Sequence, residues 1–199
     1  MARRRPGKPR PEAAGILSLF RCGIGRAILL LLLLVQPARA EQLALVPPGS
    51  QVGIRVYGLG LIPMDGRFSR FHGWMRYDLA RPNACQVILE IEAASLEMSE
   101  RVVRDTIIGP EFMDVMQFPR LAFHGACQGD AIAGDLLLHG QTHPFSLDRE
   151  ETRSNGTPEG TMVVSGRLHR ADWGMTARRF TVGSTIRIRV EIPMNRSRS

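Results

Sequence analysis

Residues 41–199 lack both lysine and a net charge. Arginine supplies every basic residue there, a bias from which we draw no mechanism. The whole chain carries 26 Lys and Arg against 19 Asp and Glu, but the first forty residues hold eight of the former and one of the latter, which leaves 18 of each. Because a neutral body has no electrostatic footprint for phosphate backbones, this composition argues against a nucleic-acid-binding protein.

A long apolar run is also missing. The run AILLLLLLV at residues 27–35 has nine residues, about half of the ~20 that a membrane-spanning helix needs. It follows a basic, proline-broken segment and precedes the A-x-A spacing of Ala38 and Ala40, which is typical of a secretory signal. We therefore expect residues 1–40 to be a signal peptide cleaved after Ala40, and residues 41–199 to form one exported domain. An uncleaved membrane anchor and a start codon assigned too far upstream are the alternatives, because the basic segment is unusually long.

Cysteine is scarce as well. The chain has three, and removal of the signal peptide takes Cys22 away. Cys85 and Cys127 then remain as an even pair in an oxidising compartment, where disulfides persist.

Most of residues 50–192 show apolar residues at every second position, the pattern of strands with one buried face. The alternation from Ile186 to Ile192 is the clearest case, whereas Phe68 falls out of phase with the run from Phe71 and suggests a bulge. One helical interruption is expected at residues 99–116, where Ser99 can cap a helix over residues 101–108. About eight antiparallel strands with so little helix to cover them favour closure into a barrel, and a sandwich is the competing fold.

Two neighbouring strands decide the cysteine pairing. If the apolar faces around Leu89 and Phe123 both point inward, the register that pairs these two residues also pairs Cys85 with Cys127, which predicts a disulfide. A register shifted by two residues keeps the pattern and breaks the pairing. A turn at residues 128–130 would likewise set Phe123 opposite Leu136, and His124 opposite Asp135 on the outer face.

Four ordered blocks are more specific than this periodicity. They are GRFSRFHGWMRYD at residues 66–78, RDTIIGPEFMDVMQFPRLAF at 104–123, GDLLLHGQTHPFSLD at 134–148, and HRADWGM at 169–175 followed by VGSTIRIRVEI at 182–192. Their order and spacing, over about residues 45–193, resemble the YceI-like family. The resemblance implies a periplasmic, lipocalin-like antiparallel barrel that holds a polyisoprenoid or quinone-like lipid.

The chain departs from the family's pattern in the second block. A histidine commonly follows the RD pair by two residues in the family, and Ile107 stands there in this chain. The following linker is one residue shorter, and Phe112 is followed by Met113 in place of a second aromatic residue. These differences predict a cavity mouth of different shape and polarity, which bears on ligand identity more than on fold.

A lipid site built from alternating strand residues has no polar motif. The inward positions predict this ligand-binding set: Val56, Phe71, Leu89, Ile91, Phe123, Leu136, Leu138 and Ile188. The alternative is a solid core made by the same residues. Gly73, Gly125 and Gly134 on the inward faces favour a cavity, because missing side chains leave room inside.

Enzymatic sites are weakly indicated. His139 and His143 are four residues apart, but HGQTH is typical of a hairpin turn in which the two rings need not converge on a metal. Ser146 and Ser165 lack a nucleophile-elbow context, and Asp172 suits a turn or cap acceptor. We expect no catalytic residue, no metal and no cofactor other than a bound isoprenoid or quinone-like lipid.

The sequence therefore predicts an all-β, lipocalin-like lipid-binding barrel of the periplasm that acts as carrier or reservoir. The alternative is a docking module for an inner-membrane redox protein, such as a b-type cytochrome, with bound quinone incidental.

Overall fold

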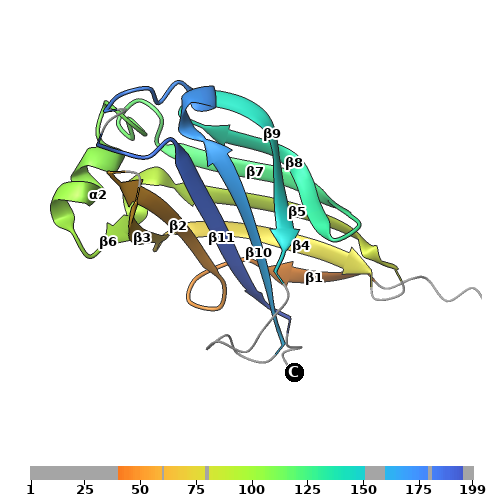
Figure 1. The fold of residues 1–199 in the computed structure, drawn as a ribbon. Coiled ribbons are helices and arrows are strands. Elements are labelled where there is room, and N and C mark those ends of the chain that lie inside the picture. The colour runs from red at the N-terminus through yellow and green to blue at the C-terminus, as the bar shows by residue number, and fades with distance from the viewer. Residues whose placement is uncertain (1–39, 60, 79–80, 151–159, 179–180, 195–199) are drawn as a thin grey trace, which may run out of the picture. The chain divides into compact units, whose positions relative to one another are not determined.

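Antiparallel strands account for most of the described residues in the computed structural model (Figure 1), which are residues 40–194 except 60, 79–80, 151–159 and 179–180. The strands are β1 (Ala40–Ala44), β2 (Gln51–Gly58), β3 (Ile62–Phe68), β4 (Phe71–Asp78), β5 (Arg81–Glu92), β6 (Leu96–Met98), β7 (Arg120–Gln128), β8 (Ala131–Leu138), β9 (Gln141–Arg149), β10 (Thr161–His169) and β11 (Thr185–Pro193). The helices are α2 (Arg101–Ile108) and two short 3₁₀ segments, η1 (Ala93–Ser95) and η2 (Arg170–Trp173).

The eleven strands of the described residues belong to one sheet, in the order β1-β4-β5-β7-β8-β9-β10-β11-β2-β3-β6. The sheet curls into a half-barrel (Figure 1), which confirms the antiparallel barrel fold class. The link between β3 and β4 is hydrogen-bonded to the end of β5 and to η1. Ser69 N–H donates to the Ser95 carbonyl at 3.1 Å, and Glu92 N–H donates to the Arg70 carbonyl at 3.1 Å. Among the described residues β1 and β6 are the edge strands, so the ladder itself is not closed.

Four strands lie outside the alternating apolar runs: β1, β3, β6 and β9. Pro63, Asp65 and Gly66 interrupt β3, Pro144 interrupts β9, and β6 has only three residues. Cross-strand partners hold these segments extended despite their weak local preference. Phe68 ends β3, opposite Val52 and Leu96, so its phase marks the end of a separate strand and not a bulge.

The helical interruption lies where the sequence predicts it, with α2 over Arg101–Ile108. The proposed cap is wrong: Glu100 is the N-cap residue, and no side-chain capping hydrogen bond forms. The Thr106 hydroxyl instead donates to the carbonyl of Val102 within the helix.

The predicted strand registers are confirmed. Leu89 pairs with Phe123, Phe123 pairs with Leu136, and His124 pairs with Asp135. Inward residues of these strands are buried in one continuous core, while His124 and Asp135 are exposed.

The described residues all belong to one compact unit, Arg39–Ser199. None of their helices is long and apolar enough to cross a membrane. Residues 1–39, with nearly all of the expected signal peptide, lie outside the described residues.

Candidate functional site

An apolar cavity of about 60 Å³ lies inside the curled sheet, on the inward faces of its strands. Eighteen side chains line it: Val52, Ile54, Phe68, Leu89, Ile91, Ile107, Met113, Leu121, Phe123, Leu136, Leu138, Phe145, Leu147, Leu168, Met175, Ile186, Ile188 and Val190. All are apolar, so the cavity offers dispersion contacts and no hydrogen-bonding side chain. Such a wall suits a hydrocarbon ligand.

Six of the eight residues in the predicted ligand set line this cavity: Leu89, Ile91, Phe123, Leu136, Leu138 and Ile188. Val56 and Phe71 do not line it, although both are buried in the surrounding core, at 1% and 7% exposure. Alternation along a strand gives the face of a residue but not its depth along the barrel. This is why the inward positions of the sequence include two residues beyond the cavity.

Ile107, Met113 and Met175 also line the cavity, and period-two alternation could not reveal them because they lie on α2 and on irregular segments. Ile107 and Met113 are two of the positions at which the chain departs from the family's pattern. These two positions therefore lie in the cavity wall, and both carry apolar side chains. In the sequence, Ile107 and Met113 were marked only by their departure from the family's motif.

The three inward glycines do not enlarge the interior, contrary to the expectation. A Cβ atom at Gly73 would lie 2.2 Å from the carbonyl oxygen of Ile88, and one at Gly134 would lie 2.0 Å from that of His124. At Gly125 the ring of Phe123 would lie 2.6 Å away. These glycines permit a close approach of neighbouring strands and of one ring, and the room comes instead from the packing of large side chains.

Buried Arg170 joins the segments that close one end of the cavity. Its guanidinium donates to the carbonyls of Met175, Val182 and Gly183, the last at 3.0 Å, and lies 5.0 Å above the ring of Phe112. Two loops, one with Met113 and one with Met175, are thus joined over the α2 end of the barrel. A second link between these loops is the ion pair of Arg178 with Glu111.

The outer wall is interrupted between β9 and β10. Within the described residues these strands pair only at Val164–Arg149 and Ser165–Asp148. Beyond that point an outer cleft of about 660 Å³ opens, and it shares Phe145 and Leu168 with the inner cavity.

Trp173 fills part of the same interruption. It is 3% exposed, its indole Nε1–H donates to the carbonyl of Leu136 at 3.3 Å, and its own carbonyl lies 2.8 Å from His139 Nδ1. Trp173, from η2, therefore fastens η2 to the end of β8.

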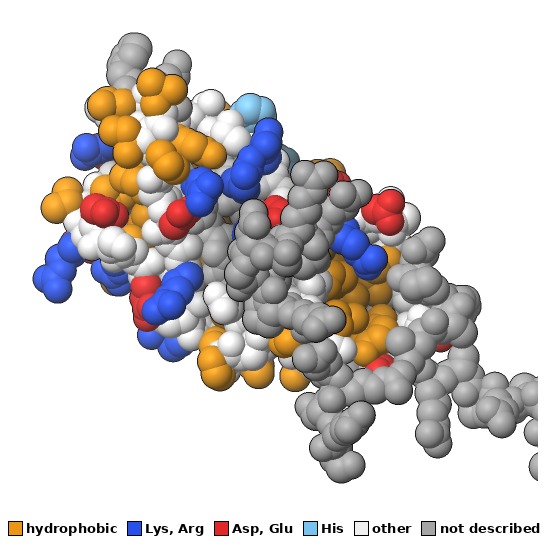
Figure 2. All heavy atoms as spheres, turned by 60° about the horizontal axis from the view of Figure 1, so that its bottom comes forward, with side chains coloured by type: hydrophobic (Ala, Val, Ile, Leu, Met, Phe, Trp, Pro, Cys, Tyr) orange, Lys and Arg blue, Asp and Glu red, His pale blue; other side chains and the backbone are white. Residues whose placement is uncertain are grey.

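Exposed hydrophobic side chains gather at the α2 end of the molecule (Figure 2). At the β2–β3 tip, Leu59 is 65% exposed, Leu61 83% and Ile62 57%, while Met116 is 92% exposed in the loop that carries Met113. The tip is tied to the Arg170 region, because Leu59 N–H donates to the carbonyl of Thr181 at 2.9 Å. The exposed apolar tip thus adjoins the end of the cavity closed by Met113 and Met175.

His139 and His143 each lie within hydrogen-bond distance of an oxygen in or near the β8–β9 turn. His139 begins the two-residue β8–β9 turn with a φ of 51°, and its Nδ1 faces the Trp173 carbonyl. His143 Nε2 lies 3.2 Å from the side-chain oxygen of Gln141. The turn predicted for HGQTH is confirmed, and the described residues contain no group of three His, Cys, Asp or Glu that could hold a metal ion.

Ion pairs lie on the outer surface of the sheet. Arg55 of β2 donates to Asp65 of β3 at 2.6 Å, and this hydrogen bond lowers the pKa of the Asp65 carboxyl. Arg70 donates to Glu92 at 2.6 Å and lowers the pKa of that carboxyl by the same cause. None of these four residues lines the cavity, whose wall consists of apolar side chains and carries no charge.

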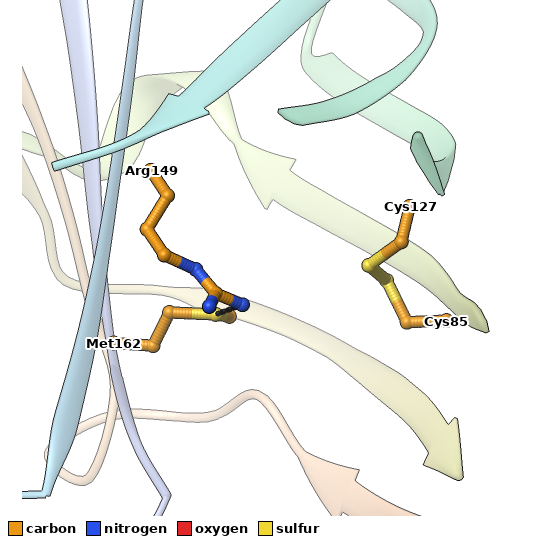
Figure 3. The surroundings of a disulfide bond; sticks show 4 residues. All are labelled: Cys85, Cys127, Arg149 and Met162. Atoms are coloured by element: carbon orange, nitrogen blue, oxygen red, sulfur yellow. Dashed lines mark hydrogen bonds between the residues drawn. A yellow bond between two sulfur atoms is a disulfide. The ribbon is translucent and has the colours of Figure 1, made fainter. Parts of the chain in front are cut away.

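Cys85 and Cys127 form the expected disulfide, with a Cα–Cα distance of 4.9 Å (Figure 3). It links β5 to β7 just beyond the paired residues Gln86 and Ala126. This position lies toward the end of the barrel away from α2.

Comparisons with known proteins agree with this architecture. A UPF0312 protein of Vibrio cholerae serotype O1 is 27% identical over 136 residues, which cover 63% of this chain and 72% of that protein. The crystal structure of Burkholderia cenocepacia BcnA superposes with a TM-score of 0.56 at 17% identity, over 71% of this chain and 94% of that one. A polyisoprenoid binding domain from Saccharophagus degradans, implicated in plant cell wall breakdown, gives a TM-score of 0.52 at 12% identity, over 77% and 97%. Residues 43–194 match the YceI-like domain, and the chain belongs to the YceI-like domain family.

Proposed function

We propose that this protein binds an isoprenoid-type lipid inside the curled sheet and serves as a carrier or reservoir. The observation that carries the proposal is the internal cavity, whose wall consists of eighteen apolar side chains and no polar one. Membership of the YceI-like family supports it, as does the similar fold of the Saccharophagus polyisoprenoid binding domain.

The cavity must widen to admit a prenyl chain. At about 60 Å³ it is smaller than the ~150 Å³ engineered cavity that accepts a benzene ring. Met113 and Met175 are the wall residues best suited to move, because an unbranched thioether side chain adopts many shapes at little cost. Lipid entry then exchanges side-chain packing for ligand packing, and the ligand-free interior keeps only the small cavity.

Energetics favour a carrier over a permanent trap. Burial of each five-carbon unit contributes roughly 3 to 4 kcal/mol relative to water. The lipid's alternative location is a membrane of similar apolarity, so transfer between membrane and protein is nearly neutral. Leu59, Leu61 and Met116 support this role, because their exposed side chains can enter a bilayer surface beside the closed end of the cavity.

We propose further that the protein is periplasmic and non-enzymatic, and that it begins at Glu41 after signal cleavage. Scarce cysteine used in one disulfide and the Ala38–Ala40 spacing support export. Intact-mass measurement of periplasmic material is expected to give a chain starting at Glu41. A product that retains residues 1–40 in the membrane fraction would contradict this part.

Mass spectrometry of an organic extract tests the lipid assignment. Protein purified from the periplasm is expected to release an isoprenoid or quinone-like lipid in stoichiometric amount. The same protein, delipidated and purified again from lipid-free buffer, is the control. A parent protein without extractable lipid would refute the proposal and favour a docking module for a membrane redox protein.

A further inference from the structure

Three arginines form a row on the outer surface of the sheet. Arg167 of β10 is the register partner of Arg187 of β11, and Arg55 of β2 is the partner of Arg187 on its other side. Their neighbours along each strand line the cavity, so these three side chains point outward. Arg55 donates to Asp65 of β3, so the row ends in an ion pair on that side. We call Arg167, Arg187 and Arg55 the arginine row.

Arg167 and Arg187 have no counter-charge of their own. No ion pair or side-chain hydrogen bond of either residue occurs among the described residues. A nearby outward pair in register has opposite charges, because Arg67 faces Glu97 and donates to it. Like charges directly opposite each other destabilise a sheet. Water can solvate each arginine separately, but solvation does not explain why two of them stand in register.

The arginine row lies behind the exposed β2–β3 tip. Arg55 precedes Leu59 by four residues, which is about 13 Å along an extended chain. Apolar groups that bind at a membrane surface enter it by about 5 to 10 Å, and the headgroup layer on each side is about 5 to 8 Å thick. When Leu59 and Leu61 enter a bilayer, the arginine row therefore lies at the level of the lipid headgroups.

The surroundings of the row favour a membrane over a free anion. Asp148, Glu150 and Asp172 line the outer cleft together with Arg167 and Arg187. An anion free in the cleft would meet these three carboxylates as well as the arginines. A membrane approaches from the tip and presents many phosphates at one depth, which suits a row of outward guanidinium groups.

We propose that Arg167 and Arg187 bind the phosphate groups of anionic phospholipids while the β2–β3 tip enters the bilayer, so that the barrel docks with its α2 end toward the membrane. This inference rests on the proposed function and adds the membrane surface with which lipid is exchanged. A planar guanidinium binds phosphate oxygens through two parallel N–H···O bonds. The docked phosphates then supply the negative charge that Arg167 and Arg187 lack in the free protein.

Vesicle co-sedimentation tests the docking surface. Purified protein is mixed with phosphatidylcholine vesicles, or with vesicles that also contain phosphatidylglycerol. The wild type is expected to bind the anionic vesicles more tightly. Arg167→Gln and Arg187→Gln should each weaken binding to the anionic vesicles about fivefold and leave binding to phosphatidylcholine unchanged. The thermal midpoint of the lipid-free Arg187→Gln protein should equal or exceed that of the wild type, because the repulsion with Arg167 is removed.

Arg76→Gln is the matched control. Arg76 is an exposed arginine toward the other end of the barrel, opposite Gln86 and beside the disulfide-bonded Cys85, and the substitution removes the same charge. It should change binding to the anionic vesicles less than twofold.

Three results would overturn the docking surface. They are equal binding of both vesicle types by the wild type, unchanged binding in Arg167→Gln and Arg187→Gln, and an equal loss in Arg76→Gln. A wild type that is stabilised by inorganic phosphate but binds both vesicle types equally would assign the arginine pair to a free anion, which also overturns the proposal. Each of these results leaves the extractable lipid unchanged, so the proposed function fails only in its own extraction test.

Discussion

The indole Nε1–H of Trp173 donates a hydrogen bond to the carbonyl oxygen of Leu136, across 37 positions of the chain. Leu136 lines the cavity, and Trp173 lies where β9 and β10 separate. This bond fastens the segment that precedes Met175 to β8, which contributes Leu136 and Leu138 to the cavity wall.

Trp173→Phe is expected to destabilise the protein by about 1 to 3 kcal/mol, because it leaves the Leu136 carbonyl buried without this donor. Chemical denaturation measures the loss. Trp74→Phe is the control, since half-buried Trp74 stacks with Arg76 at 5.0 Å and should cost about 1 kcal/mol or less. Equal losses for both variants would show that the Leu136 bond has no special weight.

The disulfide gives a second prediction. Thiol counting on non-reduced, denatured protein that starts at Glu41 should find no reactive thiol. Replacement of both Cys85 and Cys127 by alanine should lower the free energy of unfolding by at most about 4 kcal/mol, from the entropy of a loop of 42 residues. Two reactive thiols in the parent protein would refute the bridge in solution.

Leu136→Trp probes whether the interior holds lipid. Since Leu136 lines the cavity, the larger ring should occupy it, reduce the lipid recovered per mole, and cost little stability in delipidated protein. In a solid core the same change would overpack the interior and cost roughly 1 to 3 kcal/mol. Leu137→Trp, one residue away and outward, should change neither the thermal midpoint nor the lipid content much. A large stability loss in Leu136→Trp with unchanged lipid content would contradict the cavity.

Histidine substitutions test the non-enzymatic assignment. His124→Ala should leave lipid content unchanged and cost at most about 1 kcal/mol, because His124 and Asp135 face each other on the exposed outer face. His139→Ala and His143→Ala should abolish no metal-dependent activity. A metal-dependent activity lost in any of the three variants would count against a pure binding protein.

The exposed β2–β3 tip predicts contact with membranes. Leu61→Ser should weaken co-sedimentation with phospholipid vesicles about tenfold, because a buried leucine side chain contributes roughly 1.5 to 3 kcal/mol. Val46→Ser is the control, since Val46 is 42% exposed beyond the opposite end of β2. Equal vesicle binding by wild type and Leu61→Ser would remove the tip from the transfer step.

Much of the architecture follows from local pattern. Alternation placed Leu89, Phe123 and Leu136 on one face, because successive residues of a strand point to opposite sides. A short turn was enough for the β7–β8 register, whereas the pattern left two β5–β7 registers open, and the packed chain adopts the one that joins Cys85 to Cys127.

Other features required the packed chain. Ile107 and Met113 reach the cavity because the α2 segment folds over the barrel end, and buried Arg170 selects its carbonyl partners there. The separation of β9 from β10 and the position of Trp173 in that interruption depend on segments that meet from distant parts of the sequence. The sequence by itself determined which face each strand buries, since successive side chains point to opposite sides and the apolar ones fall on one side. The depth and width of the interior were decided by tertiary packing, since they depend on which side chains meet across it.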